Sequence, residues 1–556
     1  MRQRMPVGSV VVLPAKVSRV GRSAAALVAA LVLTMSPVSA CGRGGSQTFA
    51  GDPPVADVQG GDPAVVTTSA GTLRGVVAPD HRLFAGIPYA APPVGPLRFA
   101  APEPALGWVG ERDATRAGPR CIQDPAADPE RGQNTSEDCL TLNVWTPPRR
   151  TGAALPVMVW IHGGAFVNGS SGIYDARWLA SRGDMLVVTV NYRLGTLGFL
   201  AHPGLGPAGG VGNYGLSDQQ AALRWVRDNI AAFGGDPDAV TVAGESAGGM
   251  SVCDHLVAPG SAGLFRAAIV MSAPCQAQAD LATAQRRSID YAAGAGCPDP
   301  ATAAACLRAL PVDKLRNPVW YFNIGSDELT GPVTGTTVLP VAPLTAFGAG
   351  KQAHVPVLMG TTRDEFTLFT ALRYLRQGER FAPGEYPGLL DETFGVNAPA
   401  VGARYPIDRY GGVAQAYSAA VTDGEFACVA DRMAGALGRT DPVYAYEFND
   451  RGAPAPEAMR TLPFPVGASH SLELRYLFDV GGAPPLNPAQ QALSAAMIGY
   501  WSSFVHSGSP AAGGQPDWPA VDGAGPWMSL QPDGSRMVSG YQDEHQCPFW
   551  AGLKGR

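Results

Sequence analysis

The sequence has no excess of positive charge that would suit a nucleic-acid partner. Its 41 lysines and arginines are outnumbered by 47 acidic residues, and the formal net charge is −6. No basic stripe or arginine-rich block is present, whereas proteins that bind nucleic acids need clustered cations to neutralise phosphates. The composition therefore gives no support to a nucleic-acid-binding function.

The sequence also lacks the cysteine spacings of a structural metal site. Its nine cysteines include no Cys-x-x-Cys pair and no Cys/His ligand spacing, so we expect no bound metal. If Cys41 is set aside, for the reason given next, eight cysteines remain. An even number suits disulfide bonds formed in an oxidising compartment.

No apolar run near the N-terminus is long enough to span a membrane. The run from Ala24 to Met35 follows several basic residues and precedes residues 36–41 (SPVSAC), which is the order of a signal peptide. Residues 38–41 resemble the bacterial lipobox, in which the cysteine is lipidated, and they also fit an ordinary secretory cleavage site. We favour a lipid anchor on Cys41 as the membrane contact. Both alternatives predict an exported protein, either a cell-envelope lipoprotein or a secreted one.

The remaining chain divides into a short linker and one long domain. Residues 42–64 are rich in Gly, Pro, Asp and Ser, which is typical of a flexible tether. No second linker, repeat or low-complexity tract follows. We therefore predict a signal peptide over 1–40, a tether over 41–64 and a single domain over 65–556.

Alternating strand-like and helix-like runs indicate an α/β fold with a mostly parallel sheet flanked by helices. Continuous apolar strands are expected when helices cover both faces of the sheet. Four such runs occur, each ending in residues that could carry chemistry: 156–161, 185–190, 239–243 and 355–360. Apolar residues between Asp218 and Phe233 recur at helical spacing. Because open parallel sheets carry their sites at the C-terminal ends of the strands, we expect the site there.

A Gly-x-Ser-x-Gly motif, residues 244–248, is the clearest chemical signal in the chain. It follows the strand predicted over 239–243 and precedes small residues that could begin a helix. A strand, a sharp turn and a helix would lift the hydroxyl of Ser246 out of the sheet. In a chain rich in Gly and Ser, the motif alone could arise by chance. Its position between a predicted strand and a predicted helix therefore carries the prediction of a catalytic serine.

A serine nucleophile needs a base, an acid that orients the base, and donors for an oxyanion. On this fold the chain order is nucleophile, acid, histidine, which favours His470 as the base. Asp364 and Glu365 follow the strand over 355–360 and are the candidate acids, although with Arg363 they could also form a solvated acidic turn.

The other seven histidines are expected to be structural. We place five on the surface because their neighbours are polar or mixed: His81, His202, His354, His506 and His545. His162 lies in a glycine loop, and His255 should face away from the site on the helix after Ser246.

Backbone N–H groups could supply the oxyanion donors. Gly163, Gly164 and Ala165 are consecutive small residues whose N–H groups can converge on one point, and Ala247 adds the donor after the serine. The glycine cluster over 210–215 matches Gly-x-Gly-x-x-Gly but follows no strand, so we expect neither a dinucleotide site nor any other cofactor.

Several segments resemble the type B carboxylesterases, the α/β-hydrolase family that includes acetylcholinesterase. The resemblance covers about Val65 to Trp550. The segments that carry it are residues 83–95 (LFAGIPYAAPPVG), 137–147 (EDCLTLNVWTP), 233–248 (FGGDPDAVTVAGESAG) and 360–365 (GTTRDE). It implies an α/β-hydrolase fold with large helical and loop excursions around an active-site gorge.

The resemblance implies a role for each matching residue. Ser246 would be the nucleophile, Glu365 the acid and His470 the base, with Gly164, Ala165 and Ala247 holding the oxyanion. Glu245, Ser272 and Gly163 would support the site. Three disulfides are implied, Cys121–Cys139, Cys297–Cys306 and Cys428–Cys547, whereas the pairing of Cys253 and Cys275 stays open.

Three positions depart from the family pattern. Phe366 replaces the usual glycine after the acid and could reshape the wall near Glu365. Ala165 replaces a glycine, a variant common among bacterial carboxylesterases. The loop between Cys121 and Cys139 has no aromatic residue that could hold a quaternary ammonium by a cation–π contact, so a choline ester is a poor candidate substrate.

The sequence as a whole predicts a serine carboxylesterase that hydrolyses small-molecule esters through an acyl-enzyme intermediate. The acyl and alcohol pockets would come from residues 280–350 and 370–460. Alternatives are hydrolysis of a carbamate, thioester, activated amide or aggregated lipid ester by the same residues, or a non-catalytic surface binding module. The sequence gives no prediction of the natural ester, its enantiopreference or the oligomeric state.

Overall fold

The computed structural model describes residues 62–124, 134–148, 152–207, 209–522 and 525–553. The predicted signal peptide, Cys41 and most of the predicted tether lie outside these residues. Within the described ranges, no helix is long and apolar enough to cross a membrane.

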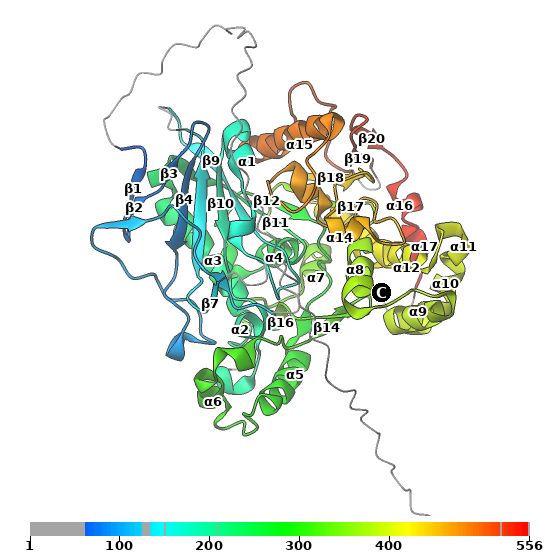
Figure 1. Ribbon diagram of the computed structural model, residues 1–556, viewed down its shortest axis with the longest axis horizontal. Helices are drawn as coiled ribbons and strands as arrows, with labels where there is room; N and C mark the ends of the chain where they lie inside the picture. Colours follow the sequence, from blue (N-terminus) through cyan, green and yellow to red (C-terminus); the bar gives the residue numbers. More distant parts are fainter. Residues whose placement is uncertain (1–61, 125–133, 149–151, 208, 523–524, 554–556) are drawn as a thin grey trace, which may run out of the picture. The chain divides into compact units, whose positions relative to one another are not determined.

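An eleven-stranded sheet forms the centre of the fold (Figure 1). Its strands, in spatial order, are β20 (Arg536–Val538), β19 (Trp527–Leu530), β18 (Val443–Phe448), β17 (Val357–Thr362), β12 (Ala267–Met271), β11 (Gly235–Glu245), β9 (Leu155–Ile161), β10 (Leu186–Val190), β8 (Thr141–Thr146), β4 (Arg82–Pro88) and β3 (Val76–Val77). The strands from β19 to β10 pair in parallel, and the outer pairs at both edges are antiparallel. The predicted, mostly parallel sheet is confirmed.

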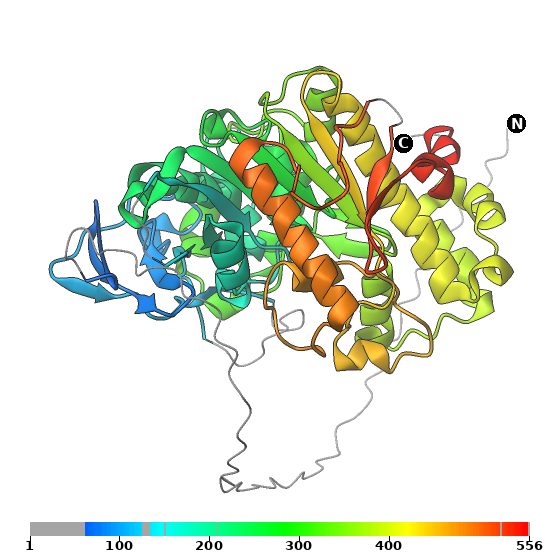
Figure 2. The same ribbon diagram turned by 90° about the horizontal axis from the view of Figure 1, so that it is seen from above.

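Helices cover both faces of this sheet, which explains its continuous apolar strands. Along β9, the side chains of Val157 and Val159 join one buried cluster, while those of Met158 and Trp160 join a second cluster on the opposite face. Figure 2 shows the long helix α15 (Pro488–Ser507) lying across the strands.

The other α-helices connect the strands or form excursions beyond the sheet. They are α1 (Arg177–Gly183), α2 (Gly195–Phe199), α3 (Tyr214–Asn229), α4 (Ala247–His255), α5 (Leu281–Gly294), α6 (Ala303–Ala309), α7 (Pro343–Gly348), α8 (Thr367–Leu372), α9 (Tyr386–Phe394), α10 (Ala398–Arg404), α11 (Ile407–Tyr410), α12 (Val413–Val421), α13 (Cys428–Leu437), α14 (Glu457–Arg460), α16 (Tyr541–Glu544) and α17 (Cys547–Ala551).

Within the part of the chain that the structure describes, nine short strands lie outside the central sheet. They are β1 (Val65–Thr68), β2 (Gly71–Arg74), β5 (Glu111–Asp113), β6 (Arg120–Cys121), β7 (Thr135–Ser136), β13 (Ala279–Asp280), β14 (Phe322–Ile324), β15 (Asp327–Leu329) and β16 (Val333–Thr334). The antiparallel pair β14–β15 lies in the region expected to supply a substrate pocket.

The predicted helix over 218–233 begins earlier than its apolar spacing indicated. Asn213 adopts a left-handed φ of 56° just before α3, where its side chain accepts from the N–H of Val333 and donates to the carbonyl of the same residue. Gly215 is required by packing, because a Cβ there would lie 2.6 Å from the carbonyl oxygen of Arg193. Packing thus explains Gly215, the last glycine of the cluster over 210–215.

Four disulfides are present in the described residues. Three are the pairs implied by the family resemblance, and the fourth joins Cys253 of α4 to Cys275 after β12. Four disulfides are consistent with folding in an oxidising compartment.

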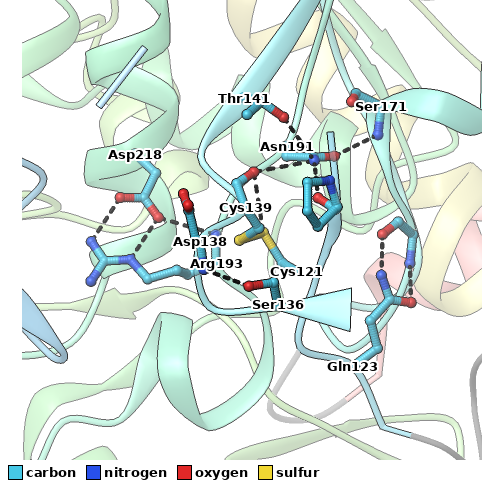
Figure 3. Close-up of a disulfide and its surroundings, with 12 residues drawn as sticks. Cys121, Gln123, Ser136, Asp138, Cys139, Thr141, Ser171, Asn191, Arg193 and Asp218 are labelled. Carbon is cyan, nitrogen blue, oxygen red and sulfur yellow. Dashed lines mark hydrogen bonds and ion pairs between the residues drawn. A yellow bond between two sulfur atoms is a disulfide. The ribbon is translucent and has the colours of Figure 1, made fainter. Parts of the chain in front are cut away.

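The Cys121–Cys139 disulfide lies within a buried polar network (Figure 3). Asn191 donates to the carbonyl of Cys139 and accepts from the N–H of Ser171. The side chain of Gln123 accepts from the N–H of Gly169 and donates to its carbonyl at 2.5 Å. This network therefore fixes the far end of the loop that begins at Gly163.

Two histidines predicted to lie on the surface are buried, which corrects that expectation. His202 and His545 are 1% and 2% exposed. The ring nitrogens of His545 lie 2.6 Å from Asp423 and 2.7 Å from Glu447. Burial lowers the pKa of His545, but Asp423 and then Glu447 outweigh it and raise the pKa to about 9. Polar neighbours in the sequence were a poor guide to the exposure of His545, because its partners Asp423 and Glu447 lie far away along the chain.

Candidate active site

Ser246 occupies the sharp turn between β11 and α4. Its φ of 57° and ψ of −124° are rare for a residue with a side chain. The turn requires the two glycines of the motif. A Cβ on Gly248 would lie 2.0 Å from the carbonyl oxygen of Ile161, and a Cβ on Gly244 would lie 2.4 Å from the backbone of Gly248. The turn leaves Ser246 partly exposed in a segment that is otherwise buried. Its hydroxyl forms no hydrogen bond with any described residue.

Three backbone N–H groups line the same cavity as Ser246. Gly164 and Ala165 have φ angles of 111° and 54°, and their N–H groups donate to no described residue. Ala247 begins α4, where an N–H has no intrahelical acceptor. All three residues line the cavity, so it contains the donors that an oxyanion would require.

Gly163 has no room for a side chain. A Cβ there would lie 2.7 Å from Oε2 of Glu245 and 3.0 Å from Cβ of Ser246. Larger residues at this position would displace the serine or the carboxylate.

The structure places Glu365 on His470. Nδ1 of His470 lies 2.5 Å from Oε2 of Glu365, whose Oε1 accepts from the N–H of Thr362 at 2.7 Å. Glu365 is fully buried and His470 is 3% exposed. This contact fixes the histidine with Nδ1 toward the acid, while Nε2 is buried and forms no hydrogen bond with Ser246.

The other candidate acid, Asp364, holds the two loops together. Its carboxylate accepts from the N–H of Ala468 at 2.9 Å and forms a bidentate pair with Arg451. Its own N–H donates to the carbonyl of Ala468. Asp364 is therefore neither the partner of His470 nor a solvated turn residue.

Three buried carboxylates surround His470. Oε1 of Glu245 lies 3.2 Å from Nε2 of His470, and Glu473 and Glu365 also act on the imidazole. Burial lowers the pKa of His470, but attraction first to Glu245 and then to Glu365 raises it to about 9. Burial raises the pKa of Glu245. The pKa of Glu473 lies well above its ordinary value, first because the group is buried and then because Glu245 and Glu365 repel its negative charge.

Two residues of this network were not predicted from the sequence. Ser471 adopts a left-handed φ of 67°, and its hydroxyl donates to Oε1 of Glu245 at 2.5 Å. Glu473 accepts from the hydroxyl of Ser272 at 3.3 Å. Both lie within three residues of His470, and the only sequence signal was the Ser-x-Glu that follows the histidine.

The cavity has a volume of about 390 Å³ and a mostly apolar wall. Ser246 and His470 both line it. The apolar part of the wall is formed by Phe166, Ile173, Tyr174, Met250, Pro274, Phe322, Ile324, Leu329, Leu368, Phe369, Leu372, Phe426 and Leu474.

Phe366, the residue that departs from the family pattern, does not line the cavity. Its ring stacks on Phe369 with centroids 4.9 Å apart, and Phe369 in turn lies 5.3 Å from the ring of His470. Phe366 thus shapes the wall indirectly, by supporting Phe369.

The other two histidines near the motif have structural contacts. His162 stacks on Tyr192, and burial lowers its pKa to about 4. His255 contacts Ser261 and Gln219 through its two ring nitrogens, away from the cavity. Among the described residues, no three His, Cys, Asp or Glu side chains are grouped to hold a metal ion.

A serine raised on a strand–turn–helix at the C-terminal edge of a parallel sheet, in a cavity that is also lined by a histidine held by an acid, defines the hydrolase class of α/β proteins. Within that class, residues 62–550 match the Carboxylesterase family. The chain therefore belongs to the carboxylesterase family and has its α/β-hydrolase fold.

Similar proteins include esterases from bacteria and mammals. Fumonisin B1 esterase of Sphingopyxis macrogoltabida is 35% identical over 507 residues, which cover 88% of this chain and 89% of the relative. Cocaine esterase of Oryctolagus cuniculus is 35% identical over 469 residues, covering 79% and 85%. Carboxylesterase 3 of Pongo abelii is 33% identical over 519 residues, covering 84% and 87%. The protein is a carboxylic-ester hydrolase that acts on small-molecule esters.

Proposed function

We propose that Ser246, His470 and Glu365 form the catalytic triad of this esterase. The observation that carries the proposal is the contact of His470 with Glu365 beside the cavity that Ser246 also lines. Such a carboxylate fixes the imidazole tautomer and stabilises the imidazolium that forms during the reaction.

The reaction would proceed in two halves. Nε2 of His470 takes the proton of Ser246, the oxygen attacks the ester carbonyl, and a tetrahedral intermediate forms. Its negative oxygen would be bound by the N–H groups of Gly164, Ala165 and Ala247. The C–O bond to the alcohol then breaks, and the alcohol takes the proton from His470. Water attacks the acyl-enzyme by the same steps and releases the acid.

Four further residues would support this chemistry. Glu245 lies close enough to Nε2 of His470 to stabilise the imidazolium. Ser272 holds Glu473, which adds a second acidic group on the same side. Gly163 provides the space in which Ser246 and Glu245 lie together.

An apolar acyl or alcohol group suits the cavity better than a strongly polar one. Aromatic and aliphatic side chains make up most of a wall that encloses about 390 Å³, and burying apolar substrate surface there is favourable. The names of the relatives point to different esters, fumonisin B1 and cocaine. We therefore base the substrate class on the cavity rather than on either name.

We also propose that the protein is exported with a signal peptide over 1–40, a tether over 41–64 and a catalytic domain over 65–556. The four disulfides support an oxidising destination. With a lipid on Cys41, the mature protein should begin at that residue and carry the added mass of the lipid. The added mass should disappear in Cys41→Ala. Mass spectrometry of the membrane fraction tests this, and an unmodified mature protein in the medium would contradict it.

Hydrolysis of p-nitrophenyl acetate, butyrate and octanoate by protein beginning at residue 42 tests the triad. Ser246→Ala should lose about 10⁴-fold or more in kcat. Ser217→Ala, in α3 and outside the cavity lining, is the matched control and should keep wild-type rates. Turnover that persists in Ser246→Ala would reject the proposal, and the chain-length profile measures the acyl pocket.

A further inference from the structure

One carboxylate lines the active-site cavity without any assigned partner. Asp327 begins β15 and belongs to the cavity wall. Its side chain forms no hydrogen bond or ion pair with any described residue. Glu245, the other cavity carboxylate, already contacts His470 and Ser471.

The neighbours of Asp327 on its own hairpin are apolar. Phe322, Ile324 and Leu329 line the cavity beside it. Desolvation raises the pKa of Asp327 to about 6. A half-buried carboxylate in such surroundings is unfavourable unless a donor or a cation satisfies it, so the position is suited to a group that the substrate brings.

The charged residues around Asp327 compensate its charge only in part. Arg373 acts on it, but this guanidinium is already in a bidentate pair with Glu379, at 2.9 and 2.6 Å. Glu379 and Glu392 both add negative charge. Arg376 lines the same cavity and is exposed.

One group behind the hairpin, the phenol of Tyr417, is neutral near pH 7. Tyr417 donates or accepts a hydrogen bond with Ser326, the residue before Asp327. Burial raises the pKa of Tyr417, so it stays protonated wherever the enzyme would be assayed.

We propose that Asp327 forms a subsite for a protonated amine, so that the enzyme prefers esters carrying a primary or secondary ammonium group at the end of an apolar chain. An ammonium N–H donates strong, charge-assisted hydrogen bonds to a carboxylate, while the chain contacts the apolar wall. This inference rests on the proposed function, because the ester must reach Ser246 in the same cavity.

The preference should depend on pH in a fixed direction. Asp327 is ionised above pH 6 and neutral well below it, so the preference for the amine should be present at pH 8 and fall as the pH drops through 6. The titration of His470 affects both members of a matched ester pair equally. It therefore cancels in the ratio of their kcat/KM values.

Two isosteric ester pairs test the subsite. The acyl pair is p-nitrophenyl 6-aminohexanoate and p-nitrophenyl heptanoate, and the alcohol pair is 6-aminohexyl butyrate and heptyl butyrate. In one of the two pairs, the kcat/KM of the wild type should be about tenfold or more higher for the amine ester than for the neutral ester. The pair that shows this preference identifies whether the subsite binds the acyl or the alcohol side of the ester. Asp327→Asn should reduce that ratio by about the same factor. Glu328→Gln, an exposed neighbour outside the cavity lining, should keep it.

An amine-to-neutral ratio that is unchanged in Asp327→Asn, or reduced equally in Glu328→Gln, would overturn the subsite. Competitive inhibition by n-hexylamine is a second measurement that needs no variant: it should weaken below pH 6, and a flat profile would overturn the proposal. These ratios are independent of the Ser246→Ala result, so failure of the triad and failure of the subsite can be told apart.

Discussion

At the scale of single residues, Glu245 has two competing partners. Its Oε1 lies near Nε2 of His470 and accepts from Ser471. A proton on the imidazole favours the contact with Glu245, whereas catalysis requires Nε2 to be neutral and free to take the serine proton. In the proposed mechanism, the hydroxyl of Ser471 therefore helps to satisfy Glu245 while His470 acts as the base.

Glu245→Gln should shift the acid limb of kcat/KM to lower pH. Glu245 helps to raise the pKa of His470 to about 9, so in the wild type the limb should lie above the ordinary histidine value of about 6.5. Removing this carboxylate removes attraction for the imidazolium, its pKa falls, and the neutral base persists to lower pH. Profiles measured with p-nitrophenyl butyrate check the shift. The exposed Glu457→Gln is the control, and a limb that moves upward in Glu245→Gln would contradict the argument.

Ser471→Ala should move the same limb in the opposite direction. Without the serine hydroxyl, Glu245 loses its hydrogen-bond donor and interacts more strongly with the imidazolium of His470. The pKa of the base then rises and activity near pH 7 falls. Ser471→Thr, which keeps a hydroxyl, should restore the profile, and an identical profile in Ser471→Ala and the wild type would count against this role.

At the scale of elements, the acid loop after β17 and the histidine loop are joined by Asp364. A hydrogen bond to a charged group is worth about 1.5–3 kcal/mol, and we expect the part-buried bond from the N–H of Ala468 to Asp364 also to hold Glu365 at its distance from His470. Asp364→Ala should lower kcat by about tenfold or more and reduce the free energy of unfolding. The side chain of Arg451, which pairs with Asp364, is 61% exposed. Arg451→Ala removes only this exposed partner and should have a small effect. Urea unfolding together with kcat measures both variants, and equal effects would contradict the argument.

The disulfides should differ in their stabilising effect according to the chain length that each one closes. In the chain-entropy account the free energy grows with that length, reaching about 4.7 kcal/mol for 100 residues. Cys428–Cys547 closes 119 residues, Cys253–Cys275 closes 22 and Cys297–Cys306 closes 9. Double Cys→Ala variants should lose stability in that order in urea titrations. The reverse order would show that local packing outweighs chain entropy.

At the scale of the whole molecule, the buried His545 makes stability depend on pH. Its pKa is about 9 in the folded state and about 6.5 when unfolded. The ion pairs with Asp423 and Glu447 therefore stabilise the protein fully below pH 6.5, and the contribution, of order 3 kcal/mol, is lost as the pH rises through 9. Urea midpoints between pH 6 and 10 should fall accordingly. His545→Gln should be less stable at pH 7 and show a smaller fall, and an unchanged slope would contradict the assignment.

Several strands could be predicted from the sequence because burial on both faces leaves a continuous apolar run. The run over 156–161 corresponds to β9, and that over 355–360 corresponds to β17 shifted by two residues. The two-residue strand β3 at the sheet edge leaves no such run. His545 was misplaced because its partners lie 122 and 98 residues away.

The candidate site was accessible to sequence analysis only where a local motif or chain order applied. Ser246 follows a recognisable strand and turn, and His470 was favoured by its position after the acid. The contact between Ser471 and Glu245 spans 226 residues and depends on the left-handed backbone at Ser471, which no local pattern encodes. The catalytic roles themselves stay predictions that the variants above will test.

The order of the site residues along the chain affects when the protein can become active during its synthesis. The site residues come from separate segments, in the order glycine loop, Ser246, Glu365 and His470. Cys547, which closes the disulfide with Cys428, lies still later, near the C-terminus. Ribosomes add about 5–20 residues per second, so a nascent chain that already contains Ser246 still lacks its acid and its base. If the proposed triad is correct, a chain that has not reached His470 carries no competent esterase, and a premature stop before His470 should yield an inactive product however much of the sheet has folded.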